Sequence, residues 1–204
     1  MVSYTLAQFP LSMVVYPGES VPLHIFEPRY RDLVHDCQAL DKPFGIVAVL
    51  DQEVMQVGTK VVLDKIKKQY SDGRIDIVVR ATGTYRIETF RTIGAGTYPE
   101  GDVHDREIIE AEDLILERDL LALVVELYSV MQIKKPAGLD DFYTLVHKLS
   151  FTLEEEYTLL SMSTMDEQRR YMVTKLEKLI PQIREVEEVR RRISMNGQYQ
   201  HHQS

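Results

Sequence analysis

The chain has 204 residues, of which 44% are hydrophobic and 27% are charged, and its formal net charge is −8. These values are typical of a globular protein with a real core, and the length fits one large domain or two small ones. The acidic balance argues against a protein whose whole surface follows nucleic-acid backbones, because such binding depends on Lys and Arg. Cys37 is the single cysteine, so no intramolecular disulfide is possible and a reducing compartment is favoured.

Residues 13–26 predict two short strands joined by a tight turn. The apolar runs Met13–Tyr16 and Val21–Phe26 flank the pair Pro17-Gly18. Proline presets φ and glycine permits a positive φ, so this pair is typical of a turn between extended segments.

A helix is predicted over Pro28–Leu40, because proline at the first helical position loses no hydrogen bond that the helix would have made. We expect the helix N-terminus to favour Glu27, and Arg29 to hold a neighbouring loop through bidentate hydrogen bonds. Phe26 and Tyr30 are expected to pin this helix to the sheet. The alternative interpretation is that these charged and aromatic residues form a recognition patch.

The following segments predict a sheet that contains a long hairpin. Phe44–Leu50 is a continuous apolar run, as in a central strand. The extended runs Val61–Tyr70 and Arg74–Thr82 are joined through Asp72-Gly73, which is a strong hairpin signal. Gly83 then predicts a bulge or a bend.

The second part of the chain predicts helices. Leu114–Ile133 is apolar on most of its circumference, which predicts a buried central helix. The last helix is predicted over Met165–Ile193, with Pro181 inside it and an apolar stripe from Met172 to Val189. Two capping boxes are predicted at the starts of later helices; they pair Thr152 with Glu155 and Thr164 with Glu167.

The change of hydrophobic period from two to about 3.6 residues near Glu110 divides the chain. We therefore predict an α+β fold, with a β-rich subdomain over residues 1–110, a helical subdomain over residues 111–195, and a disordered polar tail over residues 196–204. The charges inside Leu114–Ile133 exclude a membrane span there. The N-terminus shows no signal-peptide pattern, so a cytoplasmic protein is expected.

The sequence predicts no catalytic, cofactor-binding or metal-binding residues. A phosphate-binding run of the form G-x-x-x-x-G-K-[ST] is absent, and no G-x-S-x-G turn surrounds Ser150 or Ser161. Cys37 falls on the apolar face of its helix and predicts an inert thiol. The histidines show no metal-ligand spacing; they stand at His24, His35, His104 and His147.

Three lysines, Lys65, Lys67 and Lys68, stand beside Tyr70 in the predicted hairpin. Charge next to an aromatic ring is how single-stranded nucleic acids are held, so these lysines are the nucleic-acid candidates of the chain. The alternative is that they are solvated residues that protect an edge strand from aggregation.

Several runs resemble the Lon N-terminal (substrate-binding) domain family, and most closely its free-standing members. They cover most of the chain between Leu6 and Ile193 and match the family in order and spacing. The matching runs of the first part are Phe9-Pro10-Leu11, Tyr16-Pro17-Gly18, Pro22-Leu23-His24-Ile25-Phe26-Glu27-Pro28-Arg29-Tyr30, Val57-Gly58-Thr59, Asp72-Gly73-Arg74 and Tyr85-Arg86-Ile87. The helical end resembles the helical subdomain of the family through Asp141-Phe142-Tyr143, Leu149, Leu153-Glu154-Glu155-Glu156, Leu159-Leu160 and Arg169.

The resemblance implies a PUA-like β pseudo-barrel followed by a C-terminal helical bundle. It also implies a non-catalytic recognition module that binds polypeptide substrates or a protein partner, in a groove between the subdomains. An RNA-binding PUA-like protein is the first alternative, although the acidic balance counts against nucleic acid. A peptidase-associated component is the second, and the sequence leaves the oligomeric state open.

Overall fold

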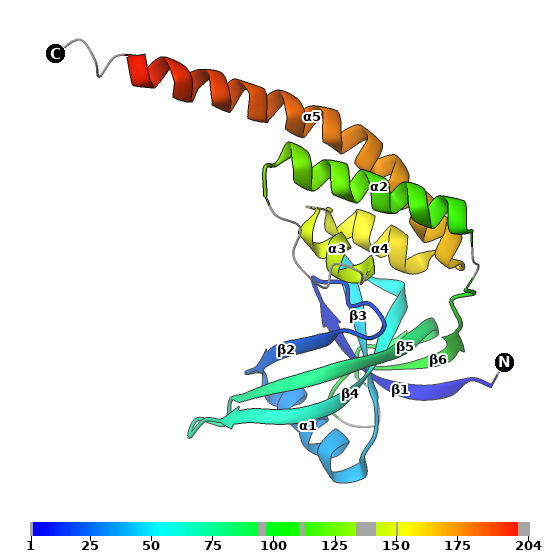
Figure 1. Ribbon diagram of the computed structural model, residues 1–204. Helices are drawn as coiled ribbons and strands as arrows, with labels where there is room; N and C mark the ends of the chain where they lie inside the picture. The colour runs from blue at the N-terminus through cyan, green and yellow to red at the C-terminus, as the bar shows by residue number, and fades with distance from the viewer. Residues whose placement is uncertain (1, 94–96, 111–112, 134–141, 150, 200–204) are drawn as a thin grey trace. The chain divides into compact units, whose positions relative to one another are not determined.

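The computed structural model describes residues 2–93, 97–110, 113–133, 142–149 and 151–199 (Figure 1). Its internal contacts divide the chain into two units. The first, called the barrel unit, comprises residues 1–108 and 151–161, and the second, called the helical unit, comprises residues 109–150 and 162–204. Each unit is described by itself below. The boundaries predicted at residues 110 and 195 stay predictions.

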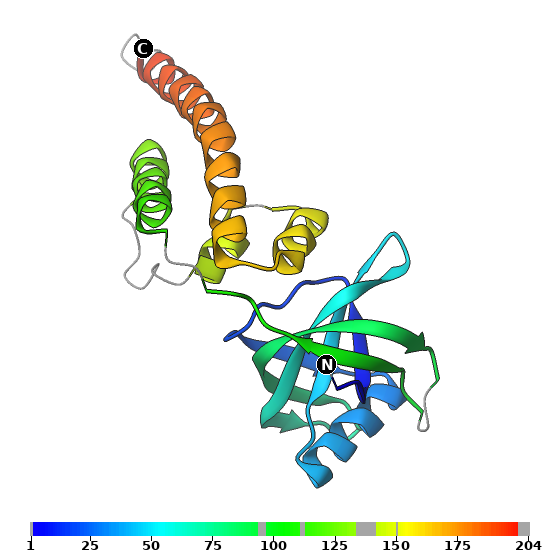
Figure 2. The same ribbon diagram turned by 90° about the vertical axis from the view of Figure 1, so that its right-hand side faces the viewer.

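The barrel unit is built on six strands within the described residues, in the order β2-β5-β4-β3-β1-β6. Pairing between β5 and β6 closes five of them into a ring, while β2 pairs with the first half of β5 (Figure 2). Helix α1, Pro28–Leu40, follows β2 and has the predicted bounds. This mixed architecture confirms the α+β prediction. The strands are β1 Tyr4–Leu11, β2 Ser20–Ile25, β3 Phe44–Leu50, β4 Glu53–Gln69, β5 Ile75–Arg91 and β6 Glu100–Arg106.

The hairpin and the central strand follow their sequence signals. The apolar run Phe44–Leu50 forms β3, which lies between β1 and β4. Gly73 has a φ of 86° at the tip of the β4–β5 hairpin, in the region that glycine adopts without a steric penalty. The register of the hairpin shifts beside Gly83, so the predicted bulge is confirmed.

The centre of the barrel unit is organised around Tyr85, whose side chain is fully buried. Its hydroxyl donates to Gln8 Oε1 at 2.6 Å, and the Gln8 side chain is fully buried as well. Gly45 and Gly58 provide the space for the Tyr85 ring, because a Cβ at either position would overlap the hydroxyl. The centre of the barrel unit therefore holds a buried polar pair, which fits there because Gly45 and Gly58 have no side chain.

The strand predicted over Met13–Tyr16 is wrong. The first strand ends at Leu11, and Val14 to Tyr16 are buried without pairing in the sheet. Side chains replace the missing sheet partners: Thr59 Oγ1 donates to the Val15 carbonyl, and the Tyr16 N–H donates to Glu19 at 2.7 Å. An apolar run in the sequence predicts burial, but it does not show which residues will form hydrogen bonds with its backbone.

The helical unit contains three helices in the described residues: α2 Leu114–Val130, α3 Phe142–Lys148 and α5 Met165–Tyr199. Asp113 pairs with Arg170 at 3.9 Å and Glu126 with Arg184 at 2.6 Å, so α2 and α5 run in the same direction. Figure 1 shows the later part of α5 extending beyond the end of α2. Helix α4, Leu153–Ser161, belongs to the barrel unit instead.

Both capping boxes are confirmed. Glu155 accepts from the Thr152 N–H at 2.9 Å while Thr152 Oγ1 accepts from the Glu155 N–H at 3.2 Å, and Thr164 and Glu167 repeat this exchange. Helix α5 continues to Tyr199, so residues 196–199, predicted as disordered tail, are helical. Residues 200–204 of that prediction lie outside the described residues.

Candidate functional site

The turn at Pro17-Gly18 is tied into the sheet. Gly18 has a φ of 86°, and its N–H donates to the Ala81 carbonyl at 3.2 Å. The Ala81 N–H donates in turn to the Glu19 carbonyl at 2.8 Å. These bonds, made by Gly18 and Glu19, join the turn to β5.

Of the two aromatic signature residues at the start of α1, one is buried and the other is exposed. Tyr30 is 5% exposed, and its ring lies 4.2 Å from that of Phe9, so it pins the helix as predicted. Phe26 is 61% exposed, so its predicted packing against the sheet is wrong. The strand that precedes it ends at Ile25, and Phe26 therefore lies beyond the last residue that pairs with β5.

Arg29 does not hold a neighbouring loop. Its guanidinium donates to Glu27 at 3.0 Å and lies 4.6 Å from the centre of the Tyr30 ring. The loop contact comes from Arg31, whose Nη1 donates to the Asp72 carbonyl at the hairpin tip at 3.3 Å. The predicted contact between an arginine of this helix and a loop exists, but it comes from Arg31 and is a single hydrogen bond. Two positions along a helix turn a side chain by about 200°, so Arg29 and Arg31 reach in different directions.

Lys65, Lys67 and Lys68 lie exposed on the outer half of β4. Lys68 Nζ lies 4.4 Å from the centre of the Tyr70 ring, and Arg74 lies over the same ring at 5.1 Å. The structure thus brings the predicted lysines and Tyr70 together at the hairpin tip.

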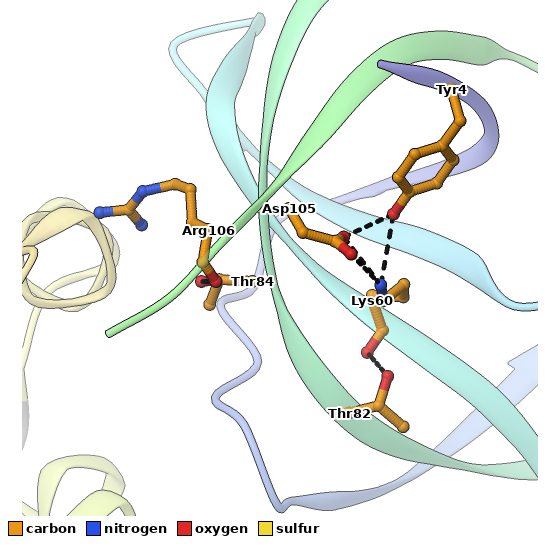
Figure 3. Close-up of polar contacts among 6 residues, drawn as sticks. All are labelled: Tyr4, Lys60, Thr82, Thr84, Asp105 and Arg106. Atoms are coloured by element: carbon orange, nitrogen blue, oxygen red, sulfur yellow. Dashed lines mark hydrogen bonds and ion pairs between the residues drawn. The ribbon is translucent and has the colours of Figure 1, made fainter. Parts of the chain in front are cut away.

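A polar cluster joins β1, β4 and β6 on the barrel (Figure 3). Lys60 Nζ donates to Asp105 at 2.7 Å, and the Tyr4 hydroxyl donates to the same carboxylate at 2.6 Å. Burial would lower the pKa of Lys60, but the bonds to Asp105 and Tyr4 outweigh it and raise that pKa. A lysine held in its charged form is a poor nucleophile, so this cluster is an ion pair that closes the barrel.

Arg106 connects β6 to helix α4 (Figure 3). Its guanidinium donates to the carbonyls of Leu160 at 3.3 Å and Ser161 at 2.9 Å, at the end of α4. Cations are favoured at a helix C-terminus, where carbonyl groups lack partners. This contact, together with the bond from the Tyr16 hydroxyl to the Glu156 carbonyl at 3.0 Å, fixes α4 on the barrel unit.

Helix α2 is not the buried central helix that its composition predicts. It buries one face, which includes Leu120, Val124 and Leu127. Other positions on the helix leave large apolar side chains in solvent. These are Leu114 at 72%, Ile115 at 64%, Leu121 at 50% and Val125 at 52% exposed. The sequence of α2 is apolar on most of its circumference, as stated above, but within the described residues only one face of the helix packs against other side chains.

A groove of about 210 Å³ lies within the helical unit. It is lined by Leu120 and Val124 from the buried face of α2 and by Leu121, which is half exposed. Glu117 and Arg169 contribute charged groups to its lining. The remaining lining is apolar and comes from three helices; it consists of Leu120, Leu121, Val124, Phe142, Leu145 and Met165. We call it the α2 groove.

The groups weighed for catalysis do not form a reactive arrangement in the part of the chain that the structure describes. Cys37 is buried, as predicted. Burial raises the pKa of its thiol to about 11, which keeps the thiol protonated. Ser161 Oγ is buried and bonds to no described residue, so no base activates it. Ser150 lies outside the described residues.

The same described residues contain no group of three His, Cys, Asp or Glu side chains placed to hold a metal ion. His24 is bonded to Asp76 at 2.6 Å and His104 to Glu88 at 3.2 Å. No described helix is long and apolar enough to cross a membrane.

Comparison with known proteins gives matches along most of the chain. Residues 5–195 match the model of the ATP-dependent protease La (LON) substrate-binding domain. A curated relative, Lon protease 2 of Syntrophobacter fumaroxidans, is 28% identical over 194 residues. That alignment covers 82% of this chain but 24% of the relative, so the chain spans about a quarter of that protease.

Two solved structures share the fold. The Lon N-terminal domain protein from Xanthomonas campestris has a TM-score of 0.60 at 23% identity, covering 87% of this chain and 98% of that one. The N-terminal domain of the Mycobacterium avium complex Lon protease has a TM-score of 0.65 at 19% identity, covering 85% and 98%. Together with the match over residues 5–195, the observations above lead to one conclusion: the chain belongs to the LON substrate-binding domain family.

Proposed function

We propose that this chain is a non-catalytic recognition module that binds apolar segments of unfolded polypeptides in the α2 groove. The observation that carries the proposal is the match of residues 5–195 to a substrate-binding domain, the one part of the Lon protease family that is detected. Any degradation of the bound polypeptide is then the task of protease and ATPase domains outside this match. The buried reduced thiol of Cys37 fits the cytoplasmic location that we also propose.

The α2 groove supports this function through its size and lining. A volume of about 210 Å³ accommodates one or two apolar side chains, and Leu121 exposes half of its side chain at the edge. Transfer of an apolar side chain from water into such a site is favourable by about 25 cal/mol per Å² of buried apolar surface. The energy depends on area rather than on hydrogen-bond geometry, so the groove suits polypeptides of varied sequence.

Strand addition to the edge of β2 is a less favourable route. In the described sheet β2 pairs with β5 alone, so its other edge is free. However, Pro22 lies within β2 and has no N–H to donate to an added strand. The groove predicted between the two subdomains stays a prediction.

The experiment compares binding of a labelled, permanently unfolded polypeptide, rich in Leu and Phe and without net charge, to three forms of the protein by fluorescence anisotropy. The test variant carries Leu121→Gln, in the lining of the groove, and Val125→Gln, an exposed residue one helical turn further along α2. Glutamine keeps the helix and removes the apolar surface. The matched control carries Val186→Gln and Val189→Gln, at positions of similar exposure, 51% and 48%, on α5.

We expect the α2 variant to bind the polypeptide at least about tenfold more weakly, since two apolar contacts of about 0.8 kcal/mol each are lost. The α5 variant should bind like the wild type. Equal affinities for the wild type and the α2 variant would contradict the proposal. So would casein cleavage by the purified chain with ATP, since that would make the chain an enzyme.

A further inference from the structure

A second surface lies at the tip of the β4–β5 hairpin, where the signature segment meets the basic strand. The register of the sheet places His24 opposite Asp76 and Asp76 opposite Lys68. Side chains in such a row share one face of the sheet. We call this surface the hairpin pad and define it by His24, Phe26, Lys65, Lys67, Lys68, Tyr70 and Arg74.

The carboxylates at the hairpin pad already have partners. Asp76 binds His24 Nδ1 at 2.6 Å through one oxygen and accepts from the Tyr70 hydroxyl at 2.7 Å through the other. Asp72 accepts from Arg74 Nε at 2.8 Å. Both acidic groups are therefore occupied within the pad, and Arg74 has its counter-charge.

Unlike Arg74, the three lysines of the pad have no carboxylate partner in the described part of the chain. Within the described residues, Lys65, Lys67 and Lys68 take part in no ion pair with a carboxylate, although the chain as a whole carries a net charge of −8. They form a local excess of positive charge, which attracts a ligand with negative charge.

Phe26 gives the pad an open aromatic surface. It is 61% exposed, and its one described ring neighbour is His24, with the ring centres 6.3 Å apart and the planes 27° apart. Lys68 and Arg74 lie over the ring of Tyr70, so Tyr70 is used inside the pad. Ring contacts from Phe26 to His24 and from His24 to Tyr70 therefore connect the exposed ring to the cations Lys68 and Arg74.

The pad is held in place before any ligand binds. Arg31 of α1 donates to the Asp72 carbonyl and lies against Gly73, so closely that a Cβ on this residue would overlap its guanidinium. This contact fixes the hairpin tip relative to the segment that carries Phe26. A preorganised site loses less conformational entropy on binding.

We propose that the hairpin pad binds an acidic polypeptide segment that carries an aromatic or large apolar residue. The apolar residue packs on Phe26, and the flanking carboxylates pair with Lys65, Lys67 and Lys68. A polypeptide fits better than a single-stranded nucleic acid, which is held on a row of stacked rings along a basic groove. The pad has one open ring, and Asp72 and Asp76 lie among its cations. The inference rests on the proposed function in that both ligands are polypeptides.

The experiment measures anisotropy of a labelled peptide in which one Phe is flanked by Glu residues, with a Gln-for-Glu peptide and an oligouridylate of equal charge as comparisons. The first variant carries Lys65→Gln, Lys67→Gln and Lys68→Gln, and the second carries Phe26→Ala. The matched control removes three other exposed positive charges; it carries Lys42→Gln, Lys148→Gln and Lys178→Gln.

We expect the wild type and the control to bind the acidic peptide alike, the triple lysine variant to bind about tenfold more weakly and Phe26→Ala about fivefold more weakly. The Gln peptide should bind as weakly as the acidic peptide binds the triple variant. Equal binding of both peptides, equal affinity of the triple variant and the control, or tighter binding of the oligouridylate would overturn the inference.

The two proposals can fail separately. The Leu121→Gln, Val125→Gln variant should keep its affinity for the acidic peptide, because the α2 groove belongs to the helical unit and the pad to the barrel unit. If the uncharged unfolded polypeptide binds while the acidic peptide does not, the pad is disproved and the proposed function stands.

Discussion

The barrel unit and the helical unit use apolar residues differently. In the barrel unit, Phe44, Val61 and Tyr85 are fully buried. In the helical unit, α2 exposes Leu114 by 72% and Ile115 by 64%, although it is among the most apolar segments of the chain. The barrel unit exposes apolar residues too, Phe26 among them, but α2 carries four large exposed apolar side chains on a single helix. A bound molecule can cover such surface.

The same contrast recurs along the single helix α5. Met172 and Leu176 are fully buried in the first half, while Val186 and Val189 are about half exposed in the second. The predicted stripe from Met172 to Val189 is continuous in sequence, but the last of its buried residues is Ile180. Apolar spacing thus predicts a face of a helix and does not predict what covers it.

The largest expected effect is the destabilisation of the barrel unit by one substitution at its centre. Gly58→Ala places a Cβ on the buried Tyr85 hydroxyl, which bonds to Gln8 and cannot retreat. We expect a loss of about 4 kcal/mol in the free energy of unfolding, from overpacking and the broken hydrogen bond. Urea denaturation measures it. Gly83→Ala is the matched control, since nothing lies within 4 Å of a Cβ there, and an equal loss in both variants would refute the close-packing explanation.

The next effect sharpens the contrast within α5. Met172→Ala removes a fully buried side chain and should cost about 3 kcal/mol of stability. Val189→Ala truncates a side chain that is 48% exposed and should cost less than about 0.5 kcal/mol. Thermal unfolding followed by circular dichroism compares them. Equal costs would mean that the outer half of α5 is buried in solution.

A smaller effect concerns the start of α5. Thr164→Ala removes the oxygen that accepts from the Glu167 N–H at 3.1 Å, so a loss of about 1 kcal/mol is expected. Thr164→Ser keeps that oxygen and should restore most of the stability. If serine and alanine are equally destabilising in urea denaturation, the capping contact is not the cause.

The smallest effect is a pH dependence in the barrel. Hydrogen bonds from Arg91 and Thr5 lower the pKa of Asp102 from 3.8 to about 2. Because this pKa is lower in the folded chain, the contribution is complete above the unfolded value and is lost as the pH falls toward about 2. Asp102→Asn should therefore be less stable than the wild type at neutral pH and approach it in acid, as melting temperatures across that range will show. A constant difference would contradict the assignment.

Local signals in the sequence were sufficient to predict an element where one residue type determines the local backbone conformation. Pro28 marked the start of α1, Asp72-Gly73 the hairpin tip, and Thr164 the cap of α5, because each acts within a few residues. The run Phe44–Leu50 marked β3 through its continuous apolar character.

Contacts between residues that are distant in the chain could not be predicted from the sequence. Val15 looked like part of a strand, but Thr59 satisfies its carbonyl from 44 positions away. Phe26 looked like a packing residue, and the sequence does not show that β2 ends before it. The α2 groove combines residues of three helices, so no spacing within one segment could have predicted it.

The most direct test of the account is hydrogen–deuterium exchange of the full chain with and without the uncharged unfolded polypeptide. Bound polypeptide should slow exchange in α2 and at the start of α5, around Met165, while the barrel strands exchange unchanged. Protection confined to the barrel strands, or none in α2 at saturating polypeptide, would contradict the claim that the polypeptide binds in the α2 groove.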